Sequence, residues 1–281
     1  MLGIENILDI YEQNRSQVLN DENFKMLLNE IKYIKYFIYD FDCLNSNKSY
    51  YFYNGTNIVP INVILDSAHR SLNSIQLCCE NCNLADAHTL IRKYRDDLFF
   101  YLYILYVQSN SDIFSENEIN KHEKNIIKWG KDNLKSLNIN EILRYIGKSK
   151  FAKEAVIKYS LQDSFKKVSE NLNNFVHSNG KSFYNKPYNY YSNNNLIKKY
   201  VEEIIYEINY ITSTFIFLLI LIREDYIMST DYVDSLEIGL NPQEGSQYWV
   251  APFITEYINK KMILISDEWK KYLKSKVSME I

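Results

Sequence analysis

The sequence predicts an all-α protein, a multi-helix bundle around one almost fully apolar helix at about residues 199–224. Two observations support this prediction. Few helix breakers occur, since the 281 residues include 7 glycines and 4 prolines, and this favours long helices with short connections. In addition, apolar residues recur at alternating spacings of four and three, which places them on one stripe of a helix: Ile204, Ile208, Ile211, Phe215, Leu218 and Ile222.

This run is apolar on its other sides too, and no charge occurs between Glu207 and Arg223. A helix that is apolar nearly all round is expected at the centre of a protein, with other helices packed on several faces. A membrane span is the alternative, but a span needs about 20 apolar residues. Because polar residues interrupt the run, we favour the core helix of a soluble bundle; they are Asn209, Thr212, Ser213 and Thr214.

The other elements follow from apolar periodicity, caps and breakers. Helices are expected over residues 3–19, 22–42, 60–82, 84–107, 139–146, 151–159, 165–176 and 266–274. A charged helix is expected to run from the capping box at Ser115 past Trp129, and a short helix to start at Thr230. Their predicted start and stop signals are Asp21, Pro60, the capping box Ser115 to Glu118, Gly147, Asp163, Gly180 and Thr230. A small ribbon at Tyr50 to Val59 is the only strand pairing that the sequence predicts. With no repeat or linker, residues 1–281 are predicted to form one helical domain.

Charge and cysteine content restrict the class of protein. A net charge of −3 and a pI of about 5.9 argue against a surface that grips nucleic acid all over, although a local basic patch remains possible. The N-terminus lacks a basic segment followed by an apolar run, so no secretory signal is expected. The four cysteines are therefore predicted to be reduced thiols in the cytoplasm: Cys43, Cys78, Cys79 and Cys82.

Common metal and nucleophile motifs are missing. Cys79 and Cys82 have the C-x-x-C spacing, and His69 and His88 could complete the four ligands of a zinc site. However, His69 and Cys79 would lie on one continuous helix and point in unrelated directions. We predict free thiols and no metal or other cofactor. No phosphate-binding glycine loop, G-x-S-x-G elbow or H-E-x-x-H motif occurs, and His122-Glu123 is followed by Ile126 where the second histidine would stand.

One set of residues remains as a candidate for chemistry. Arg92, Arg95, Asp96 and Phe99 share a helix face. His177 lies at the predicted end of another helix, where the helix dipole favours an imidazolium suited to proton transfer or phosphate binding. The alternative is structural: an Arg–Asp network that satisfies buried charge, with His177 as a helix-end cap.

Two segments around these residues carry a family resemblance. The run from Asp86 to Asp96 and the later run from Leu172 to Asn179 resemble helical proteins of the HEPN-like kind, found in bacterial abortive-infection and toxin systems. The segment Trp249 to Phe253 is similar to uncharacterised relatives of that group. The resemblance implies a helical core over about residues 60–228, often dimeric. In active members it also implies a metal-independent ribonuclease in which an arginine and a histidine act on one phosphodiester.

The chain departs from the family motif, in which an arginine stands a few residues before the histidine. Glu170, Asn171 and Leu172 occupy those positions here, so only His177 carries over. Arg92 or Arg95 on another helix would have to replace the missing arginine.

The leading functional hypothesis is an effector of a bacterial antiphage defence or toxin system that binds, and in its active form cleaves, RNA without metal. His177 would be the acid/base and Arg92 or Arg95 the phosphate ligand. Four further residues would contact the substrate: Asn171, Asn173, Asn179 and Lys181. Tyrosines of the loop at residues 178–196 would stack on unpaired bases. The alternative is a non-catalytic scaffold or regulatory subunit that binds a partner protein.

Overall fold

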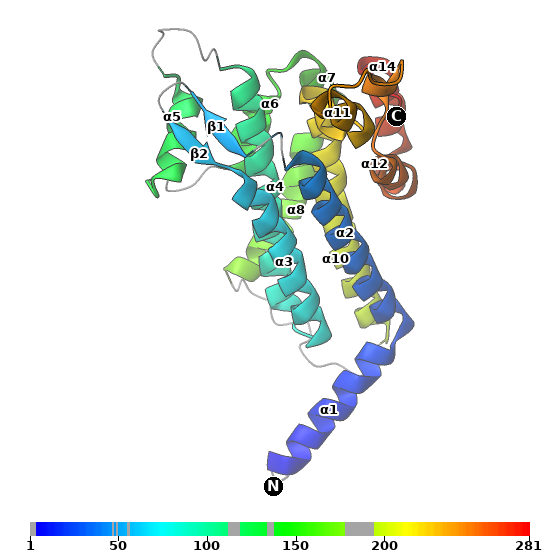
Figure 1. Ribbon diagram of the computed structural model, residues 1–281. Coiled ribbons are helices and arrows are strands. Elements are labelled where there is room, and N and C mark those ends of the chain that lie inside the picture. Colours follow the sequence, from blue (N-terminus) through cyan, green and yellow to red (C-terminus); the bar gives the residue numbers. More distant parts are fainter. Residues whose placement is uncertain are drawn as a thin grey trace.

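The computed structural model describes residues 4–46, 48, 50–54, 57–111, 119–133, 138–177 and 194–281. Within these residues the chain is mostly helical, and its one sheet has two short strands. The predicted all-α fold is therefore confirmed. Long helices run side by side through the body, shorter elements gather at its upper end, and the N-terminal helix extends away below (Figure 1).

The central helix is α10 (Asn194–Ile222). Of the six predicted stripe residues, the five from Ile204 to Leu218 are fully buried, and Ile222 at the helix end is half-buried. Helix α10 contacts α2 (Glu22–Asn45), α4 (Leu84–Ser109), α7 (Lys150–Lys158) and α14 (Asp267–Lys276). These neighbours give it the several-sided burial that its composition predicts.

The stretch Lys198–Ile222 is long and apolar enough to cross a membrane, but 89% of its most apolar window is buried inside the protein. The hydroxyl groups of two of its polar residues are hydrogen-bonded there. The Thr212 hydroxyl donates to the carbonyl of Ile208 (2.8 Å), and the Ser213 and Tyr257 hydroxyls lie 2.9 Å apart. Both observations fit the core helix of a soluble protein.

The N-terminal helices follow the predicted order. Helix α1 (Ile4–Asn20) leads into α2, and the Asp21 carboxylate accepts hydrogen bonds from the N–H groups of Asn23 (2.8 Å) and Phe24 (3.3 Å). The predicted N-cap is therefore confirmed. Helix α1 packs mainly against α2, and Figure 1 shows that it projects from the bundle.

The predicted ribbon is an antiparallel hairpin of β1 (Tyr51–Tyr53) and β2 (Ile58–Pro60). Phe52 and Val59 pair across it and point into the core, whereas Tyr51, Tyr53 and Ile58 are exposed. Pro60 was predicted in the first turn of a helix, and that placement is wrong. It is the last residue of β2, paired with Tyr51, and α3 (Asn62–Glu80) begins two residues later.

Helix α5 (Lys121–Gly130) starts at a capping box formed by Asn120 and Glu123. The capping box predicted at Ser115 lies outside the described residues. Helix α5 packs on β2, and Gly130 closes this contact. A Cβ atom at residue 130 would lie 2.7 Å from Cγ1 of Val59.

We expect Gly130→Ala to destabilise the fold by about 1–3 kcal/mol in urea unfolding, because the added methyl overpacks a tight contact. This should hold although alanine is the better helix former by about 1 kcal/mol. Combining it with Val59→Ala should cost less than the two single costs added together. A Gly130→Ala protein as stable as wild type would show that the hairpin shifts freely.

Three helices follow: α6 (Ile139–Ile146), α7 and α8 (Leu161–Val176). Asp163 was predicted to cap the last of these, and that prediction is wrong. The chain enters α8 through Ser160 in the left-handed region (φ 47°), so the helix starts earlier and Asp163 lies in its first turn. The predicted stop at Gly180 is outside the described residues.

The C-terminal segment closes the bundle near the end of α10. Its elements are η1 (Glu224–Ile227), α11 (Thr230–Glu237), η2 (Ser246–Tyr248), α12 (Pro252–Tyr257), η3 (Ile258–Met262), α13 (Ile263–Ile265) and α14. Trp269 of α14 stacks on Phe217 of α10, with ring centroids 4.7 Å apart. This contact anchors the C-terminal segment to the central helix.

Candidate functional site

A buried polar cluster joins α4, α8 and α10. Nδ1 of His88 lies 2.8 Å from Oε2 of Glu207, and the imidazole stacks on Phe175 with ring centroids 4.4 Å apart. The Asn171 amide donates to Glu207 and, over 2.8 Å, to Glu203. Because the side chains of His88 and Glu207 are only 0% and 2% exposed, a substrate cannot reach them. We interpret this cluster as a satisfied polar contact between core helices.

Arg95 is committed to neighbours inside the protein. The residue is 4% exposed. Its guanidinium donates hydrogen bonds to the carboxylate of Asp96 (2.7 and 3.0 Å) and to the hydroxyl of Ser169 (2.8 Å). Nε of Arg92 lies 3.8 Å from the other oxygen of the same Asp96 carboxylate. The described contacts are those of the structural alternative, an Arg–Asp network between α4 and α8.

His177 is exposed at the C-cap of α8, and its N–H donates to the carbonyl of Asn173 (3.1 Å). Ser169, which holds Arg95, comes eight residues earlier on the same helix, a rise of about 12 Å. None of the described contacts joins His177 to Arg92 or Arg95, so their joint action on one phosphate stays a prediction.

The four predicted substrate ligands are also distributed differently. The amide of Asn171 donates hydrogen bonds to the carboxylates of Glu203 and Glu207, so it is not available to a substrate. Asn173 has a buried Oδ1 without a hydrogen-bond partner among the described residues. Asn179 and Lys181, like the tyrosines of the predicted loop at 178–196, lie outside the described residues. The last three residues of that predicted loop, 194–196, belong to α10 instead.

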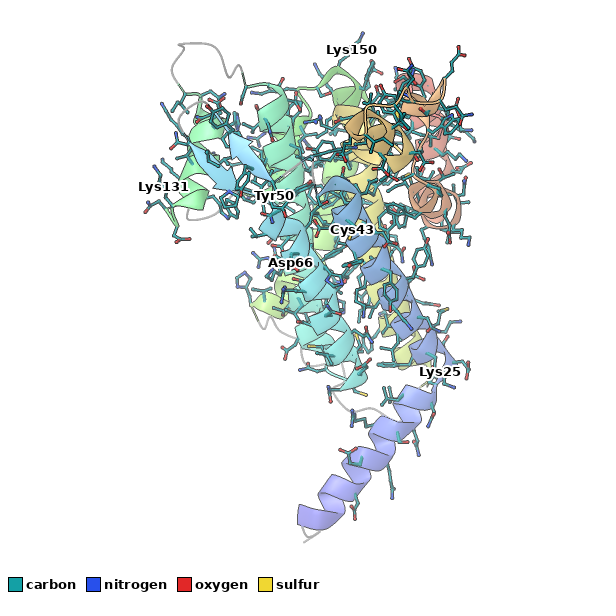
Figure 2. The ribbon with its side chains drawn as sticks, viewed as in Figure 1. Lys25, Cys43, Tyr50, Asp66, Lys131 and Lys150 are labelled. Carbon is teal, nitrogen blue, oxygen red and sulfur yellow. The ribbon has the colours of Figure 1, made fainter. Side chains whose placement is uncertain are left out.

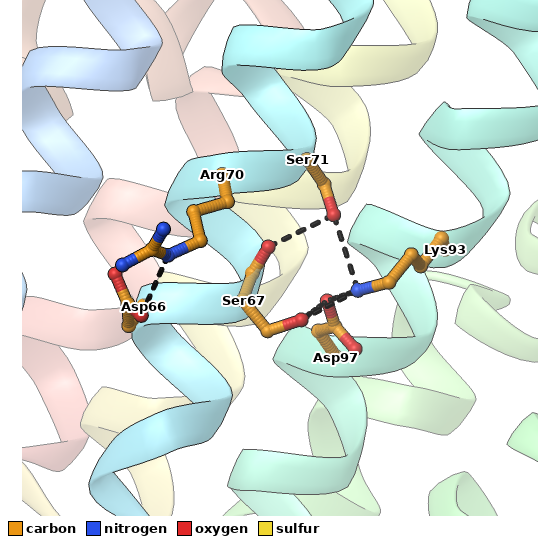
Figure 3. Close-up of polar contacts among 6 residues, drawn as sticks. All are labelled: Asp66, Ser67, Arg70, Ser71, Lys93 and Asp97. Atoms are coloured by element: carbon orange, nitrogen blue, oxygen red, sulfur yellow. Dashed lines mark hydrogen bonds and ion pairs between the residues drawn. The ribbon is translucent and has the colours of Figure 1, made fainter.

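A second polar cluster lies between α3 and α4, and Figure 3 shows it. The ammonium of Lys93 contacts Asp97 (2.6 Å), the Ser67 hydroxyl (2.5 Å) and the Ser71 hydroxyl (3.2 Å). Ser67 also donates to Asp97 (2.9 Å). A lysine that activates a serine must be deprotonated, whereas Lys93 is half-exposed and paired with a carboxylate. Burial raises the pKa of Asp97, although the positive charge and hydrogen bond of Lys93 act in the opposite direction. We interpret the cluster as a polar network that pairs α3 with α4.

No metal centre is found in the described part of the chain, where no three His, Cys, Asp or Glu side chains converge. Cys79 is fully buried, and burial raises the pKa of its thiol well above the ordinary value. His88 is bonded to Glu207, and His69 packs beside Tyr39 with ring centroids 5.6 Å apart. The two histidines that this zinc site would need are thus in contact with other residues.

Positive charge gathers in one stretch of this acidic protein. Residues 121–167 contain twelve lysines and arginines against five acids, a net charge of +7. On α5 and its C-cap the exposed lysines recur at spacings of three, four and three, so they form one stripe: Lys121, Lys124, Lys128 and Lys131. None forms an ion pair with a described residue. Lys131 lies at the outer edge of the molecule in Figure 2, and Lys150, at the start of α7, lies at its upper end.

At one end of this stripe, α5 meets α6 through an aromatic stack that we call the His122 cluster: Tyr103, Lys121, His122, Tyr145 and Lys148. The imidazole lies flat on Tyr145, with ring centroids 3.6 Å apart and planes at 23°. Its Nδ1 is 3.0 Å from the hydroxyl of Tyr103. The Lys148 ammonium sits 5.1 Å from the centroid of the Tyr145 ring. Lys148 and Lys121 are exposed, and His122 is half-buried.

The electrostatics of the His122 cluster favour anions. Burial lowers the pKa of His122, and the positive charges of Lys148 and Lys121 lower it further. Burial raises the pKa of Tyr145 to about 12, so its hydroxyl stays neutral. Two lysines and an imidazole that gains a proton when an anion approaches form a site suited to phosphate.

Sequence reasoning missed this cluster because it considered His122 only as part of a zinc motif. The available signal was the charge of residues 121–167, which the near-neutral total conceals. The contact between His122 and Tyr145 depends on how α5 packs on α6, and no spacing in the sequence predicts that packing.

Comparison of the chain with protein-family models, with curated proteins and with solved structures finds no match.

Proposed function

We propose that this protein binds single-stranded RNA through the basic stripe of α5 and the His122 cluster. The observation that carries the proposal is the cluster itself, an imidazole stacked on an aromatic ring between two exposed lysines. Exposed lysines attract the phosphate backbone. Tyr103 and Tyr145 are buried and position the imidazole, so the aromatic surface for stacking on unpaired bases has to come from nearby exposed tyrosines. The hairpin packed on α5 adds exposed aromatic area at Tyr51 and Tyr53, which are 51% and 40% exposed.

Within this proposal the protein is a cytoplasmic, homo-oligomeric effector of a bacterial defence or toxin system, as the HEPN-like resemblance implies. The resemblance is also the reason to test RNA cleavage. If His177 is the acid/base, His177→Ala abolishes cleavage and leaves the RNA affinity set by α5 unchanged. The contacts of Arg95 support the non-catalytic alternative, because a guanidinium held by Asp96 and Ser169 is not available for phosphate.

The direct test is binding of a fluorescein-labelled uridine oligomer, about 12 nucleotides long, measured by anisotropy at several salt concentrations. Wild-type protein should bind with an affinity that falls steeply as salt rises, because each neutralised phosphate releases counterions. Single-stranded RNA should bind more tightly than a duplex of equal length, in which stacked bases are hidden. No binding at about 50 mM salt would refute the proposal.

RNA binding should depend on pH through His122. Because its folded-state pKa is lowered, the fold favours the neutral imidazole. The resulting stability is fully present above the unfolded pKa, near 6.5, and is lost as pH falls through the lower folded value. A bound phosphate opposes this shift, so the affinity should rise by about three- to tenfold between pH 7.5 and 5.5. We expect His122→Asn to remove most of that rise, and an equal rise in both proteins would exclude His122 as its source.

A further inference from the structure

The segment after α10 has the opposite charge. Residues 224–259 contain seven acids and neither lysine nor arginine. Three of the seven are engaged: Asp225 with Arg223, Glu224 with Ser278 and Glu256 with Lys260. The other four form no ion pair with a described residue: Asp231, Asp234, Glu237 and Glu244. This side of the protein therefore presents uncompensated negative charge.

Helix α11, within that segment, exposes apolar residues. None of its residues is buried. Tyr232, Val233 and Leu236 lie on one side of the helix, and its three acids lie on the other. Leu236 is 53% exposed, and Ile238 and Leu240 just after the helix are 70% and 61% exposed. An apolar patch of this kind with a polar rim marks an interaction surface.

A pocket of about 320 Å³ adjoins the start of α11. Its walls come from three segments distant in sequence, namely Ser229 with Asp231, Trp249 to Pro252, and Glu280. Trp249 and Glu280 are held together by a parallel backbone bridge. The pocket is therefore lined by one tryptophan and two acidic residues, the residue types that bind a lysine or arginine side chain through cation–π attraction and ion pairing.

We propose that this surface, consisting of the apolar side of α11, Ile238, Leu240 and the adjoining pocket, binds a basic amphipathic helix of a partner protein. The partner's apolar stripe covers Leu236, Ile238 and Leu240, the acidic segment around that stripe attracts its positive residues, and one lysine or arginine enters the pocket lined by Asp231 and Glu280. This is helix recognition by an apolar surface, with charge selecting the partner. The surface is separate from the His122 cluster, so the inference does not rest on RNA binding.

The test uses the full chain and a labelled 18-residue peptide of leucine and lysine, patterned so that its leucines form one helical stripe. A scrambled peptide of the same composition and a leucine–glutamate peptide with the same pattern serve as probes of specificity. The patterned basic peptide should bind at least tenfold more tightly than either, and its affinity should fall with salt. Equal binding of the scrambled peptide would overturn the proposal.

Two pairs of substitutions locate the binding. Leu236→Ser with Ile238→Ser should lower the affinity for the patterned peptide by at least tenfold at every salt concentration. Asp231→Asn with Glu280→Gln should weaken it at least tenfold at low salt and less at high salt. The matched controls are Leu77→Ser on α3 and Glu22→Gln on α2, both at exposed positions. Unchanged peptide affinity in either test pair would overturn the proposal. So would a different result in sedimentation: a wild-type protein that is a dimer, and a Leu236→Ser, Ile238→Ser variant that is a monomer, because the surface would then bind a second copy of the chain.

Discussion

Replacing Lys121 and Lys148 together with glutamate should abolish measurable binding of single-stranded RNA, a loss of at least a hundredfold in affinity. Each lysine contributes positive charge beside His122, and each glutamate adds repulsion of phosphate. Single Lys→Ala variants should weaken binding less and should each reduce the salt slope by about one. The measurement is fluorescence anisotropy with the uridine oligomer over a series of salt concentrations.

The matched control is Lys274→Glu with Lys32→Glu, because both residues are exposed and lie on α14 and α2, away from α5. This pair changes the net charge by the same amount and should leave the affinity within about twofold at physiological salt, where charges farther apart than about 8 Å are screened. An equal loss in the control pair would mean that total charge, rather than the His122 cluster, determines binding.

His88→Ala should lower the free energy of unfolding by about 3–5 kcal/mol, a large share of the stability of an ordinary domain. The substitution leaves the Glu207 carboxylate buried with one partner fewer and removes the ring that stacks on Phe175. Urea unfolding followed by circular dichroism measures the change. His177→Ala, at an exposed helix end, should stay within about 0.5 kcal/mol of wild type.

A double variant separates the two causes of that loss. His88→Phe with Glu207→Leu removes both polar partners and restores apolar volume, so it should cost less than His88→Ala alone. If the double variant is the less stable of the two, the hydrogen bond itself, rather than the carboxylate left behind, accounts for the stability.

The sequence by itself determined the helices and the place of the central one. Apolar spacing between Ile204 and Ile222 specified a helix buried on several sides, because a period close to 3.6 residues is a local property of the chain. The sequence predicted helix caps less accurately than helices. Asp21 was recognised from its own side chain, whereas Ser160 starts α8 through a backbone conformation that residue type did not reveal.

Only the tertiary structure decided which charged residues are available for binding. Arg95 and His88 are as polar in sequence as Lys121 and His122, yet the first two are buried and bonded across helices, and the others lie at or near the surface. The physical reason is that exposure and hydrogen-bond partners depend on contacts between residues far apart in the chain, such as His88 with Glu207. Local patterns predict a helix, but helix packing determines which of its charges face solvent.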